Sequence, residues 1–308
     1  MALGDFVLQN GTLLIVIAVL ALIAGVFWVV LASSMPTIHQ FGWQFLTNQA
    51  FDPDHNSFGV GPAIFGTIVT SVFALVFAAP LGIGAAVFLV EFCPRRARTS
   101  LAFFTDLLAT VPSVVFGLWG FLVLAPWMQH SGEPWLKLHL GFLPFFVGTP
   151  RGVGLLTAGM ILTVMILPLV IAIAREVMQI VPNEQREALL ALGATRWEVV
   201  RYAILPFARV GITGGVILAL GRALGETIAV TLVIGNQANK ISPDLFATGY
   251  TLPSVIANQF GEATPGLFRS AVIEAGLILI VMTLIVNVLA RLLIARMGRH
   301  HRVGGLVA

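Results

Sequence analysis

Residues 152 to 174 read GVGLLTAGMILTVMILPLVIAIA, a stretch without a charged side chain that Arg175 brings to an end. The hydrocarbon core of a bilayer is about 30 Å thick, so a helix that crosses it needs roughly 20 apolar residues. The stretch has that length and that composition. It predicts a transmembrane helix and sets the class of fold for the whole chain.

Comparable apolar windows occur on both sides of this helix, at residues 12 to 32, 62 to 90, 100 to 127, 210 to 235 and 270 to 293. Together with the first stretch they predict an all-α integral membrane protein with six transmembrane helices. Pro80 and Pro112 lie inside two of the longer windows, where tilting or kinking is expected. The first window has no Lys or Arg before it and exceeds the length of a signal-peptide core, so we expect it to be retained.

The composition also indicates lipid as the main solvent. Of the 308 residues, 58% are hydrophobic and 10% are charged, whereas a soluble domain carries charge on about a quarter of its residues. The chain has one cysteine, Cys93. These values exclude a soluble enzyme, a disordered protein and a disulfide-rich secreted domain.

The basic residues orient the predicted helices, because Lys and Arg in short loops favour the cytoplasmic side. One side has Arg95, Arg96, Arg98, Arg175, Arg186, Arg196, Arg201, Arg209, Arg291, Arg296, Arg299 and Arg302. The opposite side has only Lys137, Arg151, Lys240 and Arg269. Both termini are therefore predicted to be cytoplasmic.

The cytoplasmic loop between residues 175 and 209 has helix signals of its own. Asn183 can cap a first helix, and Gly193 suits the left-handed position that ends such a helix. Thr195 starts a Thr-x-x-Glu capping box, so a second helix is expected from there to Pro206. By pattern alone, this unit is either an amphipathic linker on lipid headgroups or a docking element.

Two charges lie inside the fifth window, in the run Gly221-Arg222-Ala223-Leu224-Gly225-Glu226-Thr227. Arg222 and Glu226 are four residues apart, so on a continuous helix they share one face and can pair. Pairs of glycines at the same spacing, Gly211 with Gly215 and Gly221 with Gly225, are typical of close helix contacts. The charged face is expected to meet another helix or a pathway, because charge facing lipid is costly.

Two interpretations of these charges remain open. In the first, Arg222 and Glu226 form a buried ion pair that fixes helix packing. In the second, they line a path for an anion, because arginine presents a planar fork of donors that matches phosphate or sulfate oxygens. A neighbouring carboxylate repels a fully ionised anion but accepts a hydrogen bond from the hydroxyl of hydrogen phosphate. The combination favours a protonated oxyanion over sulfate.

Other polar residues give weaker signals. Asp52, Asp54 and His55 lie in a predicted turn beside Pro53, which we favour over a metal site because no second cluster accompanies them. The remaining isolated polar residues predict local or interhelical contacts: Glu91 paired with Arg95, and Asp106, Glu274 and Asn287 between helices or at helix ends.

The cytoplasmic loop resembles a known motif. Glu187-Ala188-Leu189, then Gly193 and Leu205-Pro206, is similar to the EAA loop of permease subunits in bacterial ABC importers, although Leu189 and Ala203 replace the usual alanine and isoleucine. The resemblance implies that this loop, residues 182–206, docks an ATPase subunit through Glu187, Ala188, Leu192, Gly193 and Ala194. A GxxxxGK phosphate loop is absent, so we expect the chain not to be an enzyme and to borrow its ATPase.

The stretch from Ala219 to Asn236, with residues 245–252 and 255–260, resembles the phosphate-transport permeases of these importers. Such importers have two related permease types, and Gly221 with Ala229-Val230-Thr231 favours one of them. The resemblance implies a type I ABC importer permease fold with a cytoplasmic coupling helix in the bacterial inner membrane. Alternating access would then carry inorganic phosphate past Arg222, Glu226 and Thr227.

The resemblance further implies a second permease subunit, two copies of an ATP-binding subunit and a periplasmic phosphate-binding protein as partners, with no cofactor, metal or nucleic acid. Three parts are expected: an N-terminal transmembrane helix with the first periplasmic loop (1–61), the permease transmembrane domain (62–294) and a basic cytoplasmic tail against lipid headgroups (295–308).

Alternative functions are a secondary anion and proton transporter without an ATPase, a permease of another oxyanion ABC importer, and a scaffold or sensor. The secondary transporter predicts an inverted repeat, yet no second Arg-x-x-x-Glu copy occurs in the other half of the chain.

Overall fold

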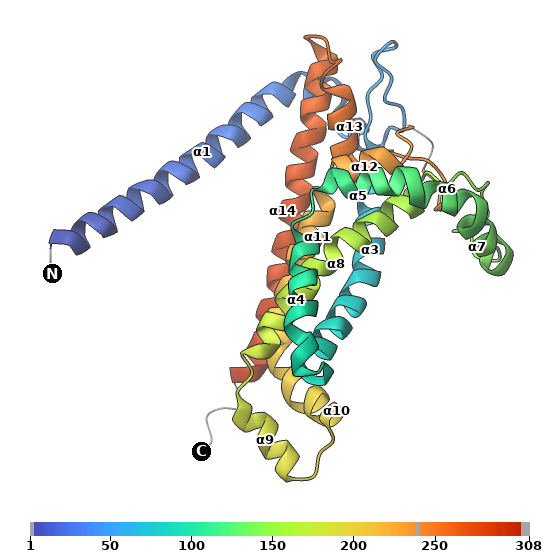
Figure 1. Cartoon of the computed structure of the whole chain (residues 1–308). Coiled ribbons are helices and arrows are strands. Elements are labelled where there is room, and N and C mark those ends of the chain that lie inside the picture. The colour runs from blue at the N-terminus through green and yellow to red at the C-terminus, as the bar shows by residue number, and fades with distance from the viewer. Residues whose placement is uncertain (1–2, 238–240, 303–308) are drawn as a thin grey trace.

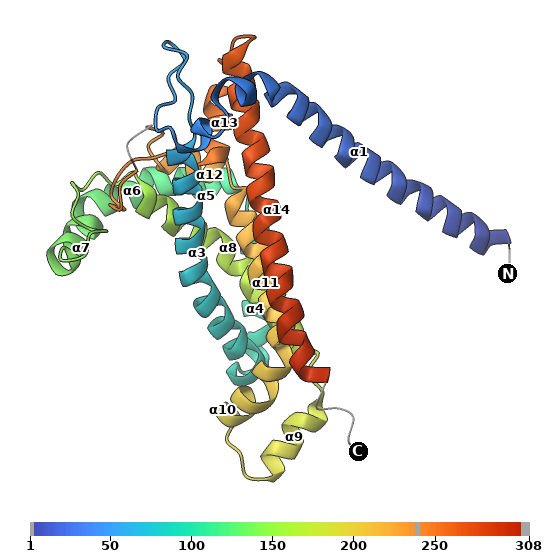
Figure 2. The same ribbon diagram turned by 180° about the vertical axis from the view of Figure 1, so that it is seen from behind.

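A computed structural model describes residues 3–237 and 241–302, so Lys240 and residues 303–308 of the predicted basic tail lie outside the described residues. The described chain is almost entirely helical, as Figures 1 and 2 show from opposite sides. Its first half consists of α1 (Leu3–Phe41), α2 (Gln44–Thr47), α3 (Gly61–Val87), η1 (Phe88–Phe92), α4 (Arg95–Ala109), α5 (Ser113–Trp119), η2 (Gly120–Leu124), α6 (Ala125–Trp127), η3 (Met128–Gly132) and α7 (Glu133–Leu140).

The second half of the chain consists of α8 (Leu155–Gln179), α9 (Asn183–Ala191), α10 (Arg196–Val199), η4 (Val200–Ile204), α11 (Leu205–Leu224), α12 (Ile228–Val233), α13 (Leu252–Gln259) and α14 (Leu267–Arg302). The η segments are single π-helical turns, in which each hydrogen bond spans five residues. Within the described ranges, six helical stretches are long and apolar enough to cross a membrane, which confirms the predicted number.

Helix α8 is the centre of the bundle. Helices α3 and α11 pack against it, and α14 packs against α11. The C-terminal end of α1 contacts the start of α14, while the N-terminal part of α1 projects away from the bundle (Figure 1). The core between α3, α8 and α11 is formed by small and branched side chains such as Ala74, Ile161 and Ala219, all fully buried. The side chains of α1, in contrast, are mostly exposed.

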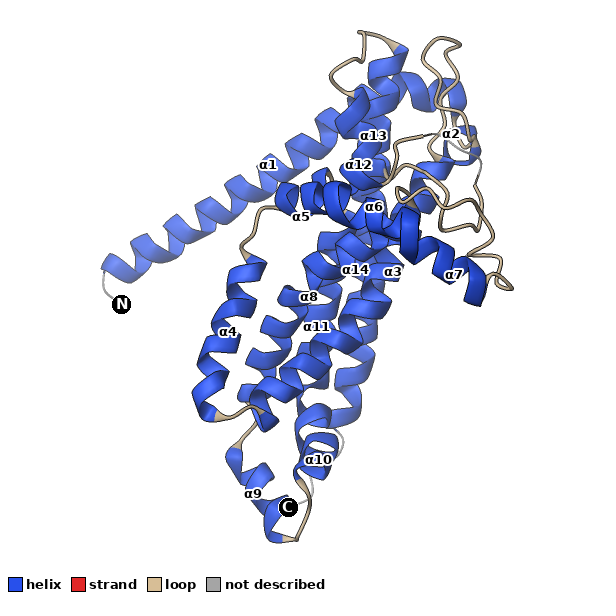
Figure 3. Cartoon of the chain, turned by 45° about the vertical axis from the view of Figure 1, so that its right-hand side comes forward, coloured by secondary structure: helices blue, strands red, loops and turns tan. Residues whose placement is uncertain are grey.

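The two ends of the bundle differ. Helices α9 and α10 extend from one end, at the bottom of Figure 1, while α12, α13 and the loop before α3 lie at the other. A helical arm that runs from α5 to α7 crosses the bundle near this second end and leads away from it, as seen also in Figure 3.

The predicted third window, residues 100 to 127, is wrong as a single helix. The chain breaks at Thr110 to Pro112, which separates α4 from the helix that runs from Ser113 to Leu140 (Figure 3). The physical reason is Pro112, which lacks an N–H donor and disfavours helical geometry at Val111. Helix α4 has no buried residue within the chain.

The predicted start of the fifth span and the predicted stop at Pro206 are also wrong. The helix begins at Arg196 and continues through the π-turn η4 and past Pro206 to Leu224. A π-turn changes the hydrogen-bond register of the backbone, so the missing N–H of Pro206 need not interrupt the helix. The span also ends earlier than residue 235, because α11 stops at Leu224.

One of the two glycine pairs forms the expected close contact. A Cβ on Gly211 would lie 2.6 Å from the Val177 side chain of α8, and a Cβ on Gly215 would lie 2.6 Å from Ile173. The backbone of α11 therefore approaches α8 as only glycine allows. The Gly221 and Gly225 pair does not do this, since a Cβ on Gly221 would lie no closer than 4.0 Å to another side chain, that of Asn287 on α14.

The neighbours Gly214 and Gly215 provide a matched test of this contact. Gly215→Leu should lower the free energy of unfolding by about 1–3 kcal/mol, because the added side chain must displace α8. Gly214→Leu should change it little, since no atom lies within 4 Å of a Cβ there. Thermal unfolding of the purified chain in detergent measures both. Equal loss in the two variants would contradict the predicted contact.

Candidate transport path and docking loop

The loop between α8 and α11 has the helix, glycine and helix order that the sequence predicts. Helix α9 ends in a Schellman motif: the Gly193 N–H donates to the Leu190 carbonyl at 3.0 Å, and the Ala194 N–H to the Leu189 carbonyl at 3.0 Å. Gly193 has φ +83°, a conformation that side chains with a Cβ rarely adopt. The glycine therefore fixes the direction in which the chain leaves α9.

The second helix of the loop starts at the predicted capping box. The Glu198 N–H donates to the Thr195 hydroxyl at 3.3 Å, and the Thr195 N–H donates to the Glu198 carboxylate at 2.7 Å. The predicted cap at the first helix is wrong by one residue: Pro182 precedes the helix, and Asn183 is its first residue without a side-chain capping bond. Pro182 has no side-chain hydrogen-bond acceptor, so α9 begins without a side-chain cap.

Four of the five predicted docking residues, Glu187, Ala188, Leu192 and Gly193, are exposed. Helix α9 has no buried residue, Glu187 and Ala188 are exposed, and Leu192 is 85% exposed. Leu189 and Ala194 are half-buried and pack into the cluster at the base of the loop. Leu190 is 48% exposed as well, so the end of α9 leaves two leucines uncovered by the chain.

Arg222 lies in the last turn of α11 and is exposed. It shares a helix face with Leu218, which is 60% exposed, and with Gly214, where no atom lies within 4 Å of a Cβ. Within residues 3–237 and 241–302, no hydrogen bond or ion pair engages its guanidinium. One face of α11 thus leaves a charge uncovered by the chain itself.

Glu226 does not pair with Arg222, and the prediction that both lie on one continuous helix is wrong. Helix α11 ends before Gly225, and the Glu226 carboxylate accepts a hydrogen bond from the Ala229 N–H at 3.2 Å. It thereby caps the first turn of α12. Thr227 lies between the two helices, and its carbonyl accepts from the Thr231 hydroxyl at 2.7 Å. Both Glu226 and Thr227 are half-buried.

Arg222 precedes one break in the span, and Glu226 and Thr227 lie within it. A guanidinium, a carboxylate with spare acceptor capacity and a hydroxyl can bind a tetrahedral oxyanion that still carries a proton. The first interpretation, a packing ion pair, is not formed in the described part of the chain.

Two variants separate a cap from an ion pair at Glu226. Glu226→Ala removes the acceptor for the Ala229 N–H and should destabilise the chain by about 1 kcal/mol, whereas Glu226→Gln keeps an acceptor and should cost only a small part of that. Thermal unfolding in detergent gives the comparison. If Gln proves as harmful as Ala, the charge and not the cap holds this segment.

Two further polar contacts hold the bundle. The Arg175 Nη2 lies 3.1 Å and 3.2 Å from the two carboxylate oxygens of Asp106, which joins α8 to α4 and confirms Asp106 as an interhelical contact. Glu91 pairs with Arg186 of α9 at 2.8 Å. The predicted partner of Glu91, Arg95, is therefore wrong, because α9 folds back toward the end of α3.

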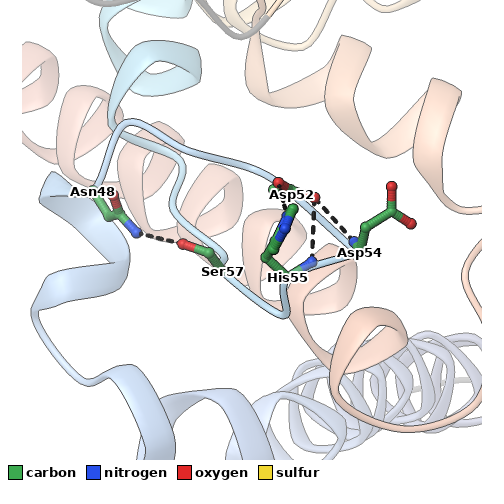
Figure 4. Close-up of polar contacts among 5 residues, drawn as sticks. All are labelled: Asn48, Asp52, Asp54, His55 and Ser57. Atoms are coloured by element: carbon green, nitrogen blue, oxygen red, sulfur yellow. Dashed lines mark hydrogen bonds and ion pairs between the residues drawn. The ribbon is translucent and has the colours of Figure 1, made fainter.

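The first external loop forms the predicted turn, drawn in Figure 4. The Asp52 carboxylate accepts from the Asp54 N–H at 3.0 Å and lies 2.7 Å from the His55 Nδ1. The hydrogen bond between them lowers the pKa of Asp52 and raises the pKa of His55. No group of three or more metal-ligating side chains occurs in the portion that the structure describes.

The fold is that of the membrane-spanning chains of ABC importers. It is similar to a chain of a bacterial alginate ABC transporter, solved in complex with an alginate pentasaccharide-bound periplasmic protein, with a TM-score of 0.59, 16% identity and coverage of 94% of this chain and 95% of that one. It is also similar to a chain of the inward-facing MetNI methionine ABC transporter, with a TM-score of 0.52, 18% identity and coverage of 78% and 94%.

Residues 78–299 match the family described as binding-protein-dependent transport system inner membrane component, and the chain belongs to this family. It is 43% identical to the phosphate transport system permease protein PstC of Mesorhizobium japonicum, over 96% of this chain and 91% of that protein. It is 41% identical to PstC of Haemophilus influenzae, over 94% and 92%. The family resemblance drawn from the sequence is confirmed.

The family assignment settles two further points. The chain is a multi-pass inner membrane protein. It is the membrane component of an ABC importer, whose ATPase is a separate subunit, so the chain is not itself an enzyme. The secondary transporter proposed as an alternative is therefore wrong.

Proposed function

We propose that the chain is the permease subunit of an ATP-driven phosphate importer, and that Arg222, Glu226 and Thr227 line its half of the phosphate path. The observation that carries the proposal is Arg222, exposed and unpaired within the described residues at the end of an apolar helix. An arginine that faces hydrocarbon costs about 3 kcal/mol or more. It is stable there only against a second protein surface or a hydrated path.

A second permease, similar to PstA, would cover this face and complete the path. One of two PstB-like ATP-binding subunits would dock on Glu187, Ala188, Leu192, Gly193 and Ala194, the other would dock on the second permease, and a PstS-like phosphate-binding protein would deliver phosphate at the opposite end. Helices α9 and α10 of the docking loop lie at one end of the bundle and α12 lies toward the other, as Figure 2 shows, which supports this division. Both termini and the 295–308 tail would then be cytoplasmic, and residues 62–294 would form the transporting domain beyond the 1–61 segment.

The preference for phosphate over another oxyanion rests on the carboxylate. Hydrogen phosphate can donate its hydroxyl to Glu226 while its other oxygens accept from Arg222, whereas sulfate has no proton to donate at neutral pH. The relatives named PstC support the same substrate.

Arg222→Gln should lower phosphate uptake at least about tenfold, because one charge-assisted hydrogen bond to the substrate is lost, while the complex still assembles. Uptake of labelled phosphate and labelled sulfate by the reconstituted complex measures it, with co-purification as the assembly control. Full phosphate uptake by the variant would show that Arg222 does not bind the substrate and serves helix packing instead. Equal uptake of sulfate and phosphate by the parent complex would contradict the predicted preference for phosphate.

Gly193→Arg should abolish co-purification of the ATP-binding subunit, because the side chain strains a left-handed residue by about 1–2 kcal/mol and obstructs the docking surface. Gly266→Arg is the matched control: Gly266 also has positive φ, +124°, and open space around it, but lies at the start of α14 at the far end of the bundle. It should retain the ATP-binding subunit. Retention by both variants would show that the docking surface lies elsewhere.

A further inference from the structure

A polar pocket of about 570 Å³ lies where α3 ends and α4 begins, against the docking loop. Its wall carries Glu91, Cys93, Arg95, Arg98, Arg186 and Arg196. The first four come from the η1 to α4 junction, and the last two come from α9 and the start of α10. The pocket therefore joins two segments far apart in the sequence at the end of the bundle that bears the docking loop (Figure 1).

The charges in this pocket do not balance. Four guanidinium groups face one carboxylate, and that carboxylate, Glu91, is held by Arg186 at 2.8 Å. Arg98 donates to the Val90 carbonyl, which carries no charge to offset it. In the described structure, neither Arg95 nor Arg196 has an ion pair. Three of the four arginines that line the pocket therefore have no ion pair in the described structure: Arg98 is half-buried, and Arg95 and Arg196 are exposed at its rim.

The backbone and buried side chains add further donors. Helix α4 starts at Arg95 after Pro94, and no side chain caps it, so the positive end of the helix dipole lies at the pocket wall. The Nε atoms of Arg98 and Arg186 and the Oε1 atom of Glu91 are buried without a hydrogen bond in the described residues, although Arg186 Nη1 lies 2.8 Å from that oxygen. Buried polar groups are usually satisfied, and at this pocket the unsatisfied donors outnumber the unsatisfied acceptor.

We propose that this arginine pocket binds a phosphate-type oxyanion. Several guanidinium forks around a small polar cavity match tetrahedral oxygens, and the α4 N-terminus favours negative charge at the same place. Free inorganic phosphate and the phosphate of an anionic lipid headgroup have this chemistry in common. In either form, the anion would offset the three charges that the chain leaves unbalanced.

The arginine pocket is separate from the transport path. Arg196 and Arg222 lie near opposite ends of one continuous helix, about 40 Å apart at the rise of an α-helix. Because Arg186 and Arg196 belong to the docking loop while Arg95 and Arg98 belong to the α4 side, an anion between them would tie the loop to the transmembrane bundle. Occupancy would therefore alter the position of the surface on which the ATP-binding subunit is expected to dock.

The test uses the assembled complex with Arg222→Gln as background, so that binding in the path is weakened. It is placed in phosphatidylcholine nanodiscs without nucleotide or binding protein, and equilibrium binding of radiolabelled inorganic phosphate is measured. Saturable binding is expected. Arg98→Gln should weaken it about tenfold, the loss of one charge-assisted hydrogen bond.

Two further variants make the result specific to the pocket. Arg95→Gln, whose side chain has no ion pair in the described structure, should also weaken binding and guards against misfolding of the Arg98 variant. Arg96→Gln, next to it but outside the pocket wall, should change binding less than about twofold. Equal losses in all three would indicate general surface charge and overturn the proposal.

Added phosphatidylglycerol distinguishes the two sources. If a lipid headgroup occupies the pocket, this lipid raises the apparent phosphate Kd in the background complex but not in Arg98→Gln. If free phosphate is the occupant, the lipid leaves the Kd unchanged. Absence of saturable phosphate binding overturns the proposal. So does binding that emerges only after the ATP-binding subunits are removed, because an acidic side chain of those subunits would then fill the pocket.

Discussion

Hydrocarbon offers no hydrogen-bond partner to a peptide group, and this constraint governs the rest of the structure. Every backbone N–H and C=O at membrane depth must find its partner inside the protein. The described chain meets the requirement with helices and with local side-chain bonds where a helix stops. At the break after α11, the Glu226 carboxylate accepts from the Ala229 N–H. The Thr227 carbonyl keeps its helical bond from the Thr231 N–H at 3.0 Å and accepts a second bond from the Thr231 hydroxyl. An interruption is thus tolerated where a polar side chain pairs a backbone group that the helix leaves without a partner.

The two interrupted spans depend on each other. Helix α12, which follows the break at Gly225, packs against α5, which follows the break at Pro112. The contact is close because two glycines lie in it and have no side chain to separate the helices. A Cβ on Gly117 would lie 2.8 Å from the Ala229 Cα, and one on Gly120 would lie 3.1 Å from the Val233 side chain. Gly117 of α5 and Ala229, Val230 and Val233 of α12 are buried, so the helix that follows the break at Glu226 is held against α5.

Sequence reasoning predicted what depends on local pattern. Apolar length gave the six spans, the Thr195 capping box and the positive φ of Gly193 followed from residue type, and Asp52 to His55 formed the predicted turn. It was wrong where tertiary packing determines where a helix ends. The four-residue spacing predicted that Arg222 and Glu226 share one helix face, but the helix ends between them. Hydropathy could not locate the breaks, since the residues on either side of them are equally apolar.

Some buried polar contacts had no signal in the sequence at all. Glu133 is fully buried, and its carboxylate accepts from the backbone N–H groups of Arg151 and Gly152 at 2.6 Å and 3.0 Å. Its partners are backbone atoms of a distant loop, which no side-chain spacing can reveal. The pairing of Glu91 with Arg186 was missed for a related reason. Arg95 is closer to Glu91 in sequence and was predicted as its partner, but the fold places Arg186 next to Glu91.

The continuous helix from Arg196 to Leu224 connects these features mechanically. One end carries the capping box of the docking loop, and the other carries Arg222 and the break. Between these ends, Gly211 and Gly215 let the backbone of α11 pack directly on side chains of α8. Because this contact is close-packed, we expect a displacement of the docking loop to move the whole helix and not only its side chains. Since a helix resists bending but its interrupted end does not, motion that enters at the docking loop is expected to emerge as a change in the angle between α11 and α12. The residues at that angle are Glu226 and Thr227, which are half-buried, so the break that we propose to line the phosphate path would also supply a hinge.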